Sequence, residues 1–563
     1  MTGRQRGGPG AQRERAGTGT RRIGGAATRR WGPLLALATA QFVMVLDQSV
    51  MNVSISTLVD DFDTTVPAIQ AVITLYCLVM AMFMLTGAKI GDIIGRRRAF
   101  VTGLVVYACG SALTAAAPTL AVLALGWSVL EGIGAALVLP ALVALVADNF
   151  TGHERTAAYA AIGGVAGAGI AVGPILGGWA TTELTWRVIF VGEVVLVVLV
   201  LLAARLLAES ARGRPAPRLD LVGTALSACG VGTVVLGTLQ SSTWGWVRPK
   251  DAPVEPFGLS PTPFVIALGG TLLWAFTAWQ RHREHAAGDP LLHLGLLKSP
   301  PLRAGLIGLF AQNLILMGVF FVMPLYLQLV LGLNALETGV RMLPVSVMMF
   351  VASAAGSRLS SRLSVRAIVR TGLVLTGAAV LALMAAVRPD LAGPAFALSM
   401  GVLGTGMGLM VSQLGNLVQS SVGTSGRAEA GGLQYTGQQL GSSLGIALIG
   451  AIVLAGLTGA FVSKVEQDQR VSAQVAEQVG VAAGTGVDFV ATGQIQAAAR
   501  KAGLGTATAD ALVDDYEEAQ LVSLKAGLLA TALLVLGSLA FTRDLPRTPA
   551  APGGGSADRR RRR

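Results

Sequence analysis

The feature that most constrains this chain is a series of fourteen apolar blocks, each about as long as a helix that crosses a bilayer. Along the 563 residues the blocks lie at about 33–57, 67–88, 99–117, 121–147, 156–181, 187–206, 219–240, 263–281, 303–331, 336–358, 366–387, 394–418, 430–463 and 520–541. Only 13% of the residues are charged, against about 25% in soluble domains. Because lipid offers the backbone no hydrogen-bond partner, blocks of this length indicate helices and not barrel strands. The sequence therefore predicts an all-α polytopic membrane protein with fourteen transmembrane helices.

The basic residues are distributed unevenly between the loops, and this predicts the orientation of the chain. Most of the 43 Lys and Arg residues fall in the two termini and in the loops on the same side as the termini. By the positive-inside rule, both termini are cytoplasmic. We expect the basic segments 1–30 and 546–563 to be disordered tails that contact anionic lipid headgroups. Nucleic-acid binding is disfavoured, since the tails have no interleaved aromatic residues and no fold around them.

The sequence has no pattern that indicates a cofactor, a metal site or an enzyme. Its three cysteines lie inside predicted spans without CxxC spacing, so we interpret them as small core residues: Cys77, Cys109 and Cys229. All four histidines lie in predicted cytoplasmic loops: His153, His282, His285 and His293. A phosphate-binding GxxxxGK[ST] and a Ser/His/Asp grouping are both absent. A membrane enzyme and a membrane sensor are therefore the disfavoured classes.

The stretch MLTGAKIGDIIGRRRAF (84–100) places one acid and four bases between two apolar blocks. Cytoplasmic anchoring explains the arginines but not Asp92. Three glycines four apart predict one face on which helix 2 closely contacts a neighbour: Gly87, Gly91 and Gly95. Asp92 can accept hydrogen bonds from the amino-terminal amides of a neighbouring helix, or from Arg96 or Arg97. We expect this contact to form in one conformation and to break in another.

A weak internal repeat indicates two related halves. GSRLSSRLSVR (356–366) aligns with GAKIGDIIGRR so that Gly356 falls on Gly87 and Arg358 on Lys89, with Ser361 in place of Asp92. The chain then divides into a six-helix half (31–207), a linker with two extra helices (208–302) and a second six-helix half (303–545). Two repeated halves around a midplane site are typical of transporters. Within the second half, we interpret 463–518 as an external helical hairpin.

The turn at 84–100 resembles the loop 2–3 signature of the major facilitator superfamily, G-x-L-a-D-r-x-G-r-r. Asp92, Gly95, Arg96 and Arg97 match it, and the leading glycine is one place early at Gly87. Helix 5 contains GIAVGPILGG, a complete antiporter signature of that superfamily: Gly169, Gly173, Pro174, Gly177 and Gly178. Helix 1 contains LDQSVMNVSIS, which is similar to L-D-x-T-I-V-N-V-A-L-P of the fourteen-helix drug:proton antiporters through Asp47 and Asn52. The resemblance implies the major facilitator fold and a helix 5 that acts in the conformational change.

Three acids lie inside predicted spans, where a charge costs about 2.5–3.5 kcal/mol on insertion scales. They are Asp47 in helix 1, Glu131 in helix 4 and Glu193 in helix 6. Burial favours the protonated form of a carboxylate, so these acids are the candidates for proton coupling. Each could instead be a satisfied packing residue. For Glu193 this alternative weighs as much as the functional one, because helix 6 is usually peripheral in the superfamily.

The resemblance also predicts which residues line the substrate cavity: Asp47, Asn52, Ser128, Glu131, Gln312, Asn313 and Arg341. One of them departs from the family pattern. Helix 4 of the family carries an arginine tied to proton coupling, whereas this chain has Ser128 there and Glu131 in place of a glutamine. Helices 1 and 4 therefore offer two acids and no base, which suits cationic substrates or indicates altered coupling. Whether Arg341 pairs with Asp47 is left open by the sequence.

These observations favour a monomeric, proton-coupled exporter of amphipathic small molecules, cationic or neutral, such as antibiotics. It would work by alternating access in the cytoplasmic membrane, with small-molecule substrate, protons and membrane lipids as its partners. The alternative within transport is an exporter of a lipid or an endogenous metabolite on the same fold.

The predicted topology can be tested by cysteine labelling from outside the cell. In a variant without native cysteines, a probe at Ser556 should not react with an impermeant maleimide, whereas a probe at Thr243, in the loop after helix 7, should react. The positive-inside bias is the reason for this expectation. The reversed pattern would contradict the fourteen-span arrangement.

Overall fold

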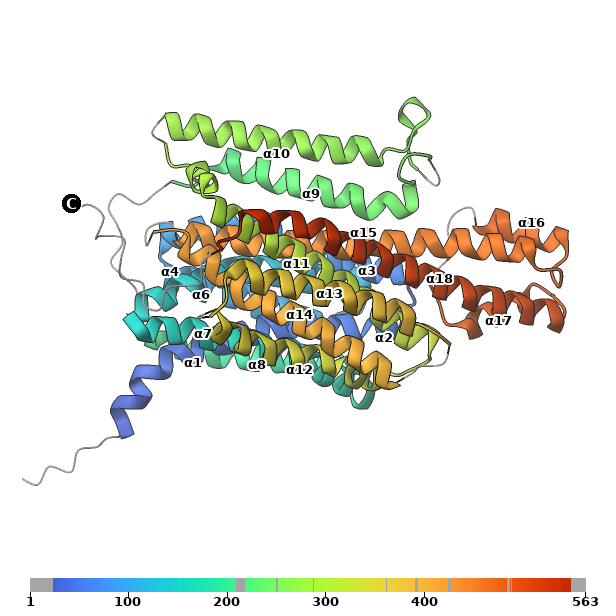
Figure 1. The fold of residues 1–563 in the computed structure, drawn as a ribbon, viewed down its shortest axis with the longest axis horizontal. Helices are drawn as coiled ribbons and strands as arrows, with labels where there is room; N and C mark the ends of the chain where they lie inside the picture. Colours follow the sequence, from blue (N-terminus) through green and yellow to red (C-terminus); the bar gives the residue numbers. More distant parts are fainter. Residues whose placement is uncertain are drawn as a thin grey trace, which may run out of the picture.

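The computed structural model describes residues 24–150, 152–208, 218–249, 252–286, 288–360, 362–389, 393–423, 427–483, 487 and 489–547. Within these ranges the chain is helical without strands, and fourteen helices are long and apolar enough to cross a membrane. Their axes run side by side along the long dimension of the molecule (Figure 1). The predicted all-α fold with fourteen transmembrane helices is confirmed.

The first six spans form the amino-terminal half. Its elements are α1 (Gly24–Val53), α2 (Ile55–Asp61), α3 (Val66–Ile94), α4 (Arg96–Ala115), α5 (Leu120–Leu123), η1 (Ala124–Glu131), α6 (Gly132–Asn149), α7 (Gly152–Glu183), α8 (Arg187–Ala203) and η2 (Ala204–Leu206). The fourth span is continuous through α5, η1 and α6. Helix α1 begins inside the segment predicted as a disordered tail, since it starts at Gly24, ahead of the apolar span that begins at Trp31. Residues 1–23 and 548–563, the rest of the predicted tails, lie outside the described residues.

The linker contributes two helices that lie together on one flank of the bundle (Figure 1). They are α9 (Leu221–Trp244) and α10 (Thr262–His285), with η3 (Pro256–Gly258) between them and η4 (Leu294–Lys298) after them. Helix α9 contacts both α3 of the first half and α15 of the second. The prediction that His282 and His285 follow the eighth span is wrong, because α10 continues through both residues.

The last six spans form the carboxy-terminal half. Its elements are α11 (Pro300–Leu325), η5 (Tyr326–Val330), α12 (Ala335–Leu359), α13 (Val365–Ala386), α14 (Gly393–Ser420), α15 (Arg427–Gln467), α16 (Ala473–Ala482), α17 (Thr492–Lys501), α18 (Thr506–Ser538) and η8 (Leu539–Asp544). The two halves meet along two helix pairs, α3 with α15 and α7 with α12. These are the contacts that any movement between the halves must change.

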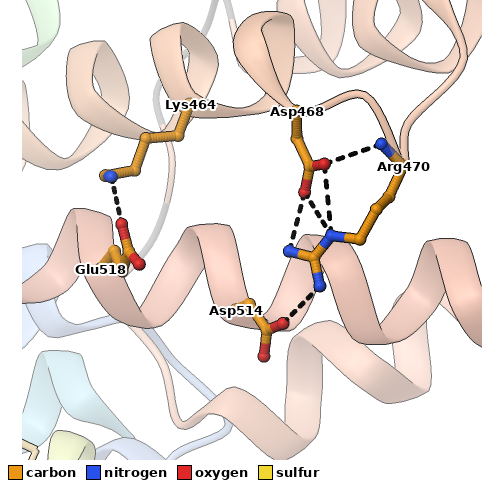
Figure 2. A network of polar contacts seen from close by, with 5 residues as sticks. All are labelled: Lys464, Asp468, Arg470, Asp514 and Glu518. Carbon is orange, nitrogen blue, oxygen red and sulfur yellow. Dashed lines mark hydrogen bonds and ion pairs between the residues drawn. The ribbon is translucent and has the colours of Figure 1, made fainter.

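The segment between α15 and α18 projects beyond the rest of the bundle and contains α16 and α17 (Figure 1). Ion pairs link the end of α15 and the residues that follow it to α18 (Figure 2). Lys464 pairs with Glu518, and Arg470 pairs with Asp468 at 2.8 Å and with Asp514 at 2.7 Å. Hydrogen bonds from Arg470 hold the pKa of Asp468 below its usual range. We call this the hairpin end of the molecule. The opposite end, with the α3–α4 turn and η8, is the tail end.

The glycines of the α3–α4 turn do not form one contact face as predicted. A Cβ at Gly87 would collide with the carbonyl oxygen of Ala136 on α6, so this glycine does permit close packing. At Gly91 the nearest atom to a Cβ would be the Ala99 Cβ at 3.8 Å, an ordinary contact. Gly95 lies outside the helix, since α3 ends at Ile94 and Gly95 has a φ of 103°. That backbone conformation favours glycine and starts α4 directly.

The glycine motif of α7 faces two neighbours. A Cβ at Gly173 would collide with Ser49 of α1, and one at Gly177 would lie 3.0 Å from the Cα of Val50. On another side, Gly178 contacts the backbone of Ala335 on α12, and Gly339 of α12 contacts the carbonyl of Pro174. The motif therefore joins α7 to α1 within one half and to α12 of the other. Pro174 lies inside α7 at the contact with α12.

Gly87 and Gly91, both on α3 before the α3–α4 turn, give a matched test of the packing between α3 and α6. Gly87→Ala should lower the melting temperature of the purified protein, because overpacking against backbone costs about 1–3 kcal/mol. Gly91→Ala should leave it unchanged or slightly raised, because alanine favours helix by about 0.5–1 kcal/mol over glycine. Equal destabilisation of both variants, measured by fluorescence-detected size exclusion after heating, would contradict the difference in packing.

Candidate functional site

The fourth span changes its helical geometry where its functional residues lie. Between α5 and α6, the segment η1 is a π-helix, and it carries Trp127, Ser128 and Glu131. Such segments are rare and are frequent at functional sites. Helix α4 packs unusually close to this segment, since a Cβ at Gly110 would lie 2.6 Å from the Cγ of Glu131. The close approach places the Glu131 side chain between η1 and α4.

Three acids converge in the interior of the amino-terminal half. Asp47 comes from α1, Glu131 from η1 and Glu193 from α8, and their exposed fractions are 0%, 0% and 1%. One carboxylate oxygen of each lies within 4.8 Å of those of the other two. We call these three residues the acid cluster. The structure thus brings together all three acids that the sequence singled out, including Glu193 from the helix expected to be peripheral.

Each member of the acid cluster has hydrogen-bond partners at one oxygen only. Trp127 Nε1 donates to Asp47 Oδ1 at 2.7 Å. Tyr107 and Ser111 of α4 both donate to Glu193 Oε2 at 3.3 Å. The Thr114 hydroxyl lies 3.4 Å from Glu131 Oε1 and also bonds the Gly110 carbonyl. The other oxygens are buried without a hydrogen-bond partner: Asp47 Oδ2, Glu131 Oε2 and Glu193 Oε1.

The acid cluster has no positive charge to balance it among the described residues. No Lys, Arg or His forms an ion pair with any of its three members. Carboxylates this close cannot all be ionised in an interior of low dielectric constant. Bound protons or a bound cation must therefore compensate the charge. Among the described residues it is also the one group of acids, histidines and cysteines whose ligand atoms converge closely enough to hold a metal ion.

Two aromatic residues that the sequence analysis did not single out complete the site. Tyr76 of α3 stacks on Trp127, with ring centroids 4.6 Å apart and an angle of 3° between the planes. The Tyr76 hydroxyl is buried beside Asp47 and has no partner in hydrogen-bond geometry. Trp127 directly precedes Ser128, one of the residues predicted to line the cavity. An apolar span gives no sequence signal that separates a donating tryptophan from a packing one.

The uncharged residues predicted to line a cavity form hydrogen bonds outside the acid cluster or have an unpartnered buried oxygen. Ser128 donates to the Val72 carbonyl at 2.8 Å, so the position of the family's arginine is a packing contact with α3. Asn52 and Asn313 donate to carbonyls of their own helices, those of Gln48 at 2.7 Å and Leu309 at 2.9 Å. Asn52 Oδ1 and Gln312 Oε1 are buried without partners.

Arg341 does not neutralise Asp47. It lies near the start of α12 at the hairpin end, where its side chain is exposed and lies beside Gly393. Asp47 is fully buried and bonded to Trp127. The question that the sequence left open is therefore answered: in this conformation the two charges are separate.

The charged turn forms a contact that includes an unpredicted acid. Arg96 Nη1 lies 3.0 Å from Asp148 Oδ1 near the end of α6, and Arg96 Nη2 lies 3.7 Å from Asp92 Oδ1. Asp92 therefore meets Arg96, one of its predicted partners, in the weaker of two ion pairs. Arg97 is half-buried in the first turn of α4. The repeat position Ser361 lies outside the described residues.

Comparison with known proteins defines the family. The model of the Major Facilitator Superfamily matches residues 37–446, and the chain belongs to this superfamily. Its fold is similar to the crystal structure of a bacterial homologue of the human lysosomal transporter Spinster in an inward-facing, unoccupied conformation. The TM-score is 0.56 at 15% sequence identity, over 93% of this chain and 100% of the other. The protein is therefore a multi-pass membrane transporter and not an enzyme.

Among curated proteins, the chain is similar to three exporters and resistance proteins of actinobacteria. It is 31% identical to the puromycin resistance protein of Streptomyces alboniger, over 77% of this chain and 84% of that protein. It is 27% identical to the tetracenomycin C resistance and export protein of Streptomyces glaucescens, over 77% and 78%. It is 29% identical to the multidrug efflux pump LfrA of Mycolicibacterium smegmatis, over 76% and 82%.

The protonation of the acid cluster can be tested by chemical labelling. Dicyclohexylcarbodiimide, an apolar reagent, modifies protonated carboxyl groups in apolar surroundings. At neutral pH we expect adducts on one or more of Asp47, Glu131 and Glu193, because three close carboxylates without a base must retain protons. Peptide mass spectrometry of the labelled protein would show which acid carries the adduct.

Asp220 is the control for this labelling, since it is also buried. Burial acts to raise its pKa, but hydrogen bonds from the Gly223 amide, Trp279 and Gln280 outweigh it and hold the pKa below the usual range. Asp220 should therefore stay ionised and unlabelled. Labelling of Asp220 without labelling of the acid cluster would show that the cluster is charged.

Proposed function

We propose that this transporter exports amphipathic small molecules of the antibiotic class, cationic or neutral, in exchange for protons. The similarity to a puromycin resistance protein, a tetracenomycin exporter and a multidrug efflux pump supports the direction of transport and the kind of substrate. The transporter works by alternating access between its two halves, as the α3–α15 and α7–α12 pairs allow.

The observation that carries the proton coupling is the acid cluster without a base. A site that must hold compensating positive charge can exchange one carrier of that charge for another. When protons leave, the cluster becomes anionic and attracts a cationic substrate, and when protons return they expel it. The protonated cluster and the substrate-bound cluster therefore exclude each other, which is the requirement for exchange of protons and substrate in opposite directions.

Asp47 is the proton carrier in this proposal. It lies on α1, which contacts both α11 and α12 of the other half, so a movement between the halves can reach Asp47 through its own helix. Trp127 keeps one of its oxygens fixed through the 2.7 Å hydrogen bond, and the other oxygen is available to a proton. Glu131 and Glu193, which accept hydrogen bonds from residues of α4, exchange protons with Asp47. They also determine which cationic substrates bind.

The orientation in the membrane follows from the charge of the tail end. We place the tail end, with both termini and the α3–α4 turn, in the cytoplasm and the hairpin end outside the cell membrane. The basic termini then lie next to anionic lipid headgroups. The protein acts as a monomer, since one chain contains both halves and all three acids.

The proposal is tested with purified protein in proteoliposomes and ethidium as the cationic probe. Asp47→Asn should reduce proton-driven ethidium transport to background, because the carrier can no longer change its charge. Exchange of ethidium between equal concentrations should persist in part, because exchange requires no net movement of protons. Glu131→Gln and Glu193→Gln should keep proton-driven transport and change the preference among ethidium, puromycin and neutral substrates.

Asp515→Asn is the matched control, because it removes a buried acid of α18 that lies outside both the acid cluster and the linker. It should transport ethidium at the wild-type rate. Normal uphill transport by Asp47→Asn would reject Asp47 as the carrier, and normal transport by all three cluster variants would reject proton coupling at this site. Proton flux driven by neither ethidium nor puromycin would reject the substrate class in favour of a lipid or metabolite.

A further inference from the structure

The segment between α10 and η4 lies across the junction of the two halves at the tail end. We call residues 289–293 the strap. It belongs to the linker that carries the two extra helices, yet it contacts α3 of the first half and α15 of the second. A connection that only joined α10 to α11 would not need contacts to both halves.

The strap is fixed to its own linker helices by an ordered set of hydrogen bonds. The amides of Leu291 and Leu292 both donate to Gln280 Oε1 of α10, at 2.8 and 3.3 Å. Gln280 Nε2 in turn donates to Asp220 Oδ2 at the start of α9, at 2.8 Å. All of these groups are buried, so the strap, α9 and α10 are joined as one unit.

A buried lysine connects the strap to the first half. Lys89 of α3 is 8% exposed, and its Nζ donates to the Pro290 carbonyl at 2.9 Å. Lysine is rarely buried without a partner, and here the Pro290 carbonyl of the strap accepts its hydrogen bond. Lys89 lies three residues before Asp92, within the charged turn that resembles the superfamily signature.

A histidine connects the strap to the second half. His293 Nδ1 lies 2.7 Å from Glu429 Oε1 in the first turn of α15, and the His293 amide donates to Glu429 Oε2 at 3.3 Å. Between the two polar links, Leu291 and Leu292 are buried in an apolar cluster that includes Leu85 of α3 and Leu433 of α15.

We propose that the strap is a latch that holds the tail-end parts of α3 and α15 together and must release one of them before the halves separate there. Each half is held by few polar groups and by the same two leucines, so the latch can open without unfolding either half. The two extra helices would then control the conformational cycle. This inference requires neither the substrate nor the proton coupling proposed above.

The latch is tested with a cross-link across the junction it spans. A Cβ at Gly432 of α15 would lie 3.2 Å from the Ala88 Cβ of α3, close to the separation in a disulfide. Ala88→Cys with Gly432→Cys, in the full chain without native cysteines, should form a disulfide readily in membrane vesicles with limiting oxidant. No substrate or proton gradient is present, so the result stands apart from the transport assays.

Variants of the strap should slow this cross-linking, because the two cysteines would spend less time together. We expect a decrease of about threefold for His293→Ala or Glu429→Ala, the range for a partly exposed ion pair. The two together should slow it no more than Glu429→Ala alone, because that variant already removes both hydrogen bonds between the residues. Leu291→Ser with Leu292→Ser should have the largest effect. His285→Ala, an exposed histidine on the last turn of α10, is the control and should cross-link at the original rate.

Unchanged cross-linking in the His293 and Glu429 variants would overturn the latch. Additive effects of the two would also overturn it, since they would show that the residues act separately. These two positions keep the proposal testable if the double leucine variant does not fold, which gel filtration of each variant would show.

Discussion

The burial of three carboxylates side by side is the constraint on which the rest of this structure depends. An isolated charge inside a membrane protein is costly, and three like charges within a few ångströms are costlier still. The protein places hydrogen-bond donors at one oxygen of each acid, through Trp127, Tyr107 with Ser111, and the Thr114 hydroxyl. The other oxygen of each acid is buried without a hydrogen-bond partner. The cluster is therefore stable only with added positive charge, and that requirement is what a coupled transporter can use.

Close helix packing makes this arrangement possible. Glu131 reaches the cluster because the π-helical turn of η1 and the small residue Gly110 let the fourth span and α4 lie almost in backbone contact. Glu193 reaches it because α8 packs on α4, where Tyr107 and Ser111 lie on the facing side. A bulkier residue at Gly110 would displace Glu131 directly. The position of Glu131 in the acid cluster thus depends on a glycine at a helix contact.

The two junctions between the halves are built differently. At α7 and α12 the backbones contact each other through Pro174, Gly178 and Gly339. Two hydrogen bonds add to this contact, from the Leu336 amide to Thr182 Oγ1 and from the Ser346 hydroxyl to the Ile170 carbonyl. At α3 and α15 the tail end is held by side chains and by the strap, through Lys89 and Glu429. The α3–α15 junction thus includes contacts through the linker at the tail end, whereas the α7–α12 junction consists of direct contacts between the two helices.

The sequence by itself determined the helical membrane fold, the number of spans, the superfamily and the identity of the three buried acids. It could do so because hydrophobic length, charge in apolar blocks and glycine spacing are local properties of the chain. Only the tertiary structure decided that Glu193 joins Asp47 and Glu131, that Arg341 stays apart from them, and that Arg96 meets Asp148. It also decided that Gly95 belongs to a turn and that Trp127 is a donor. These outcomes depend on which helices pack together and at what rotation, and an apolar helix can bury any of its faces, so residues distant in sequence are brought together by packing alone.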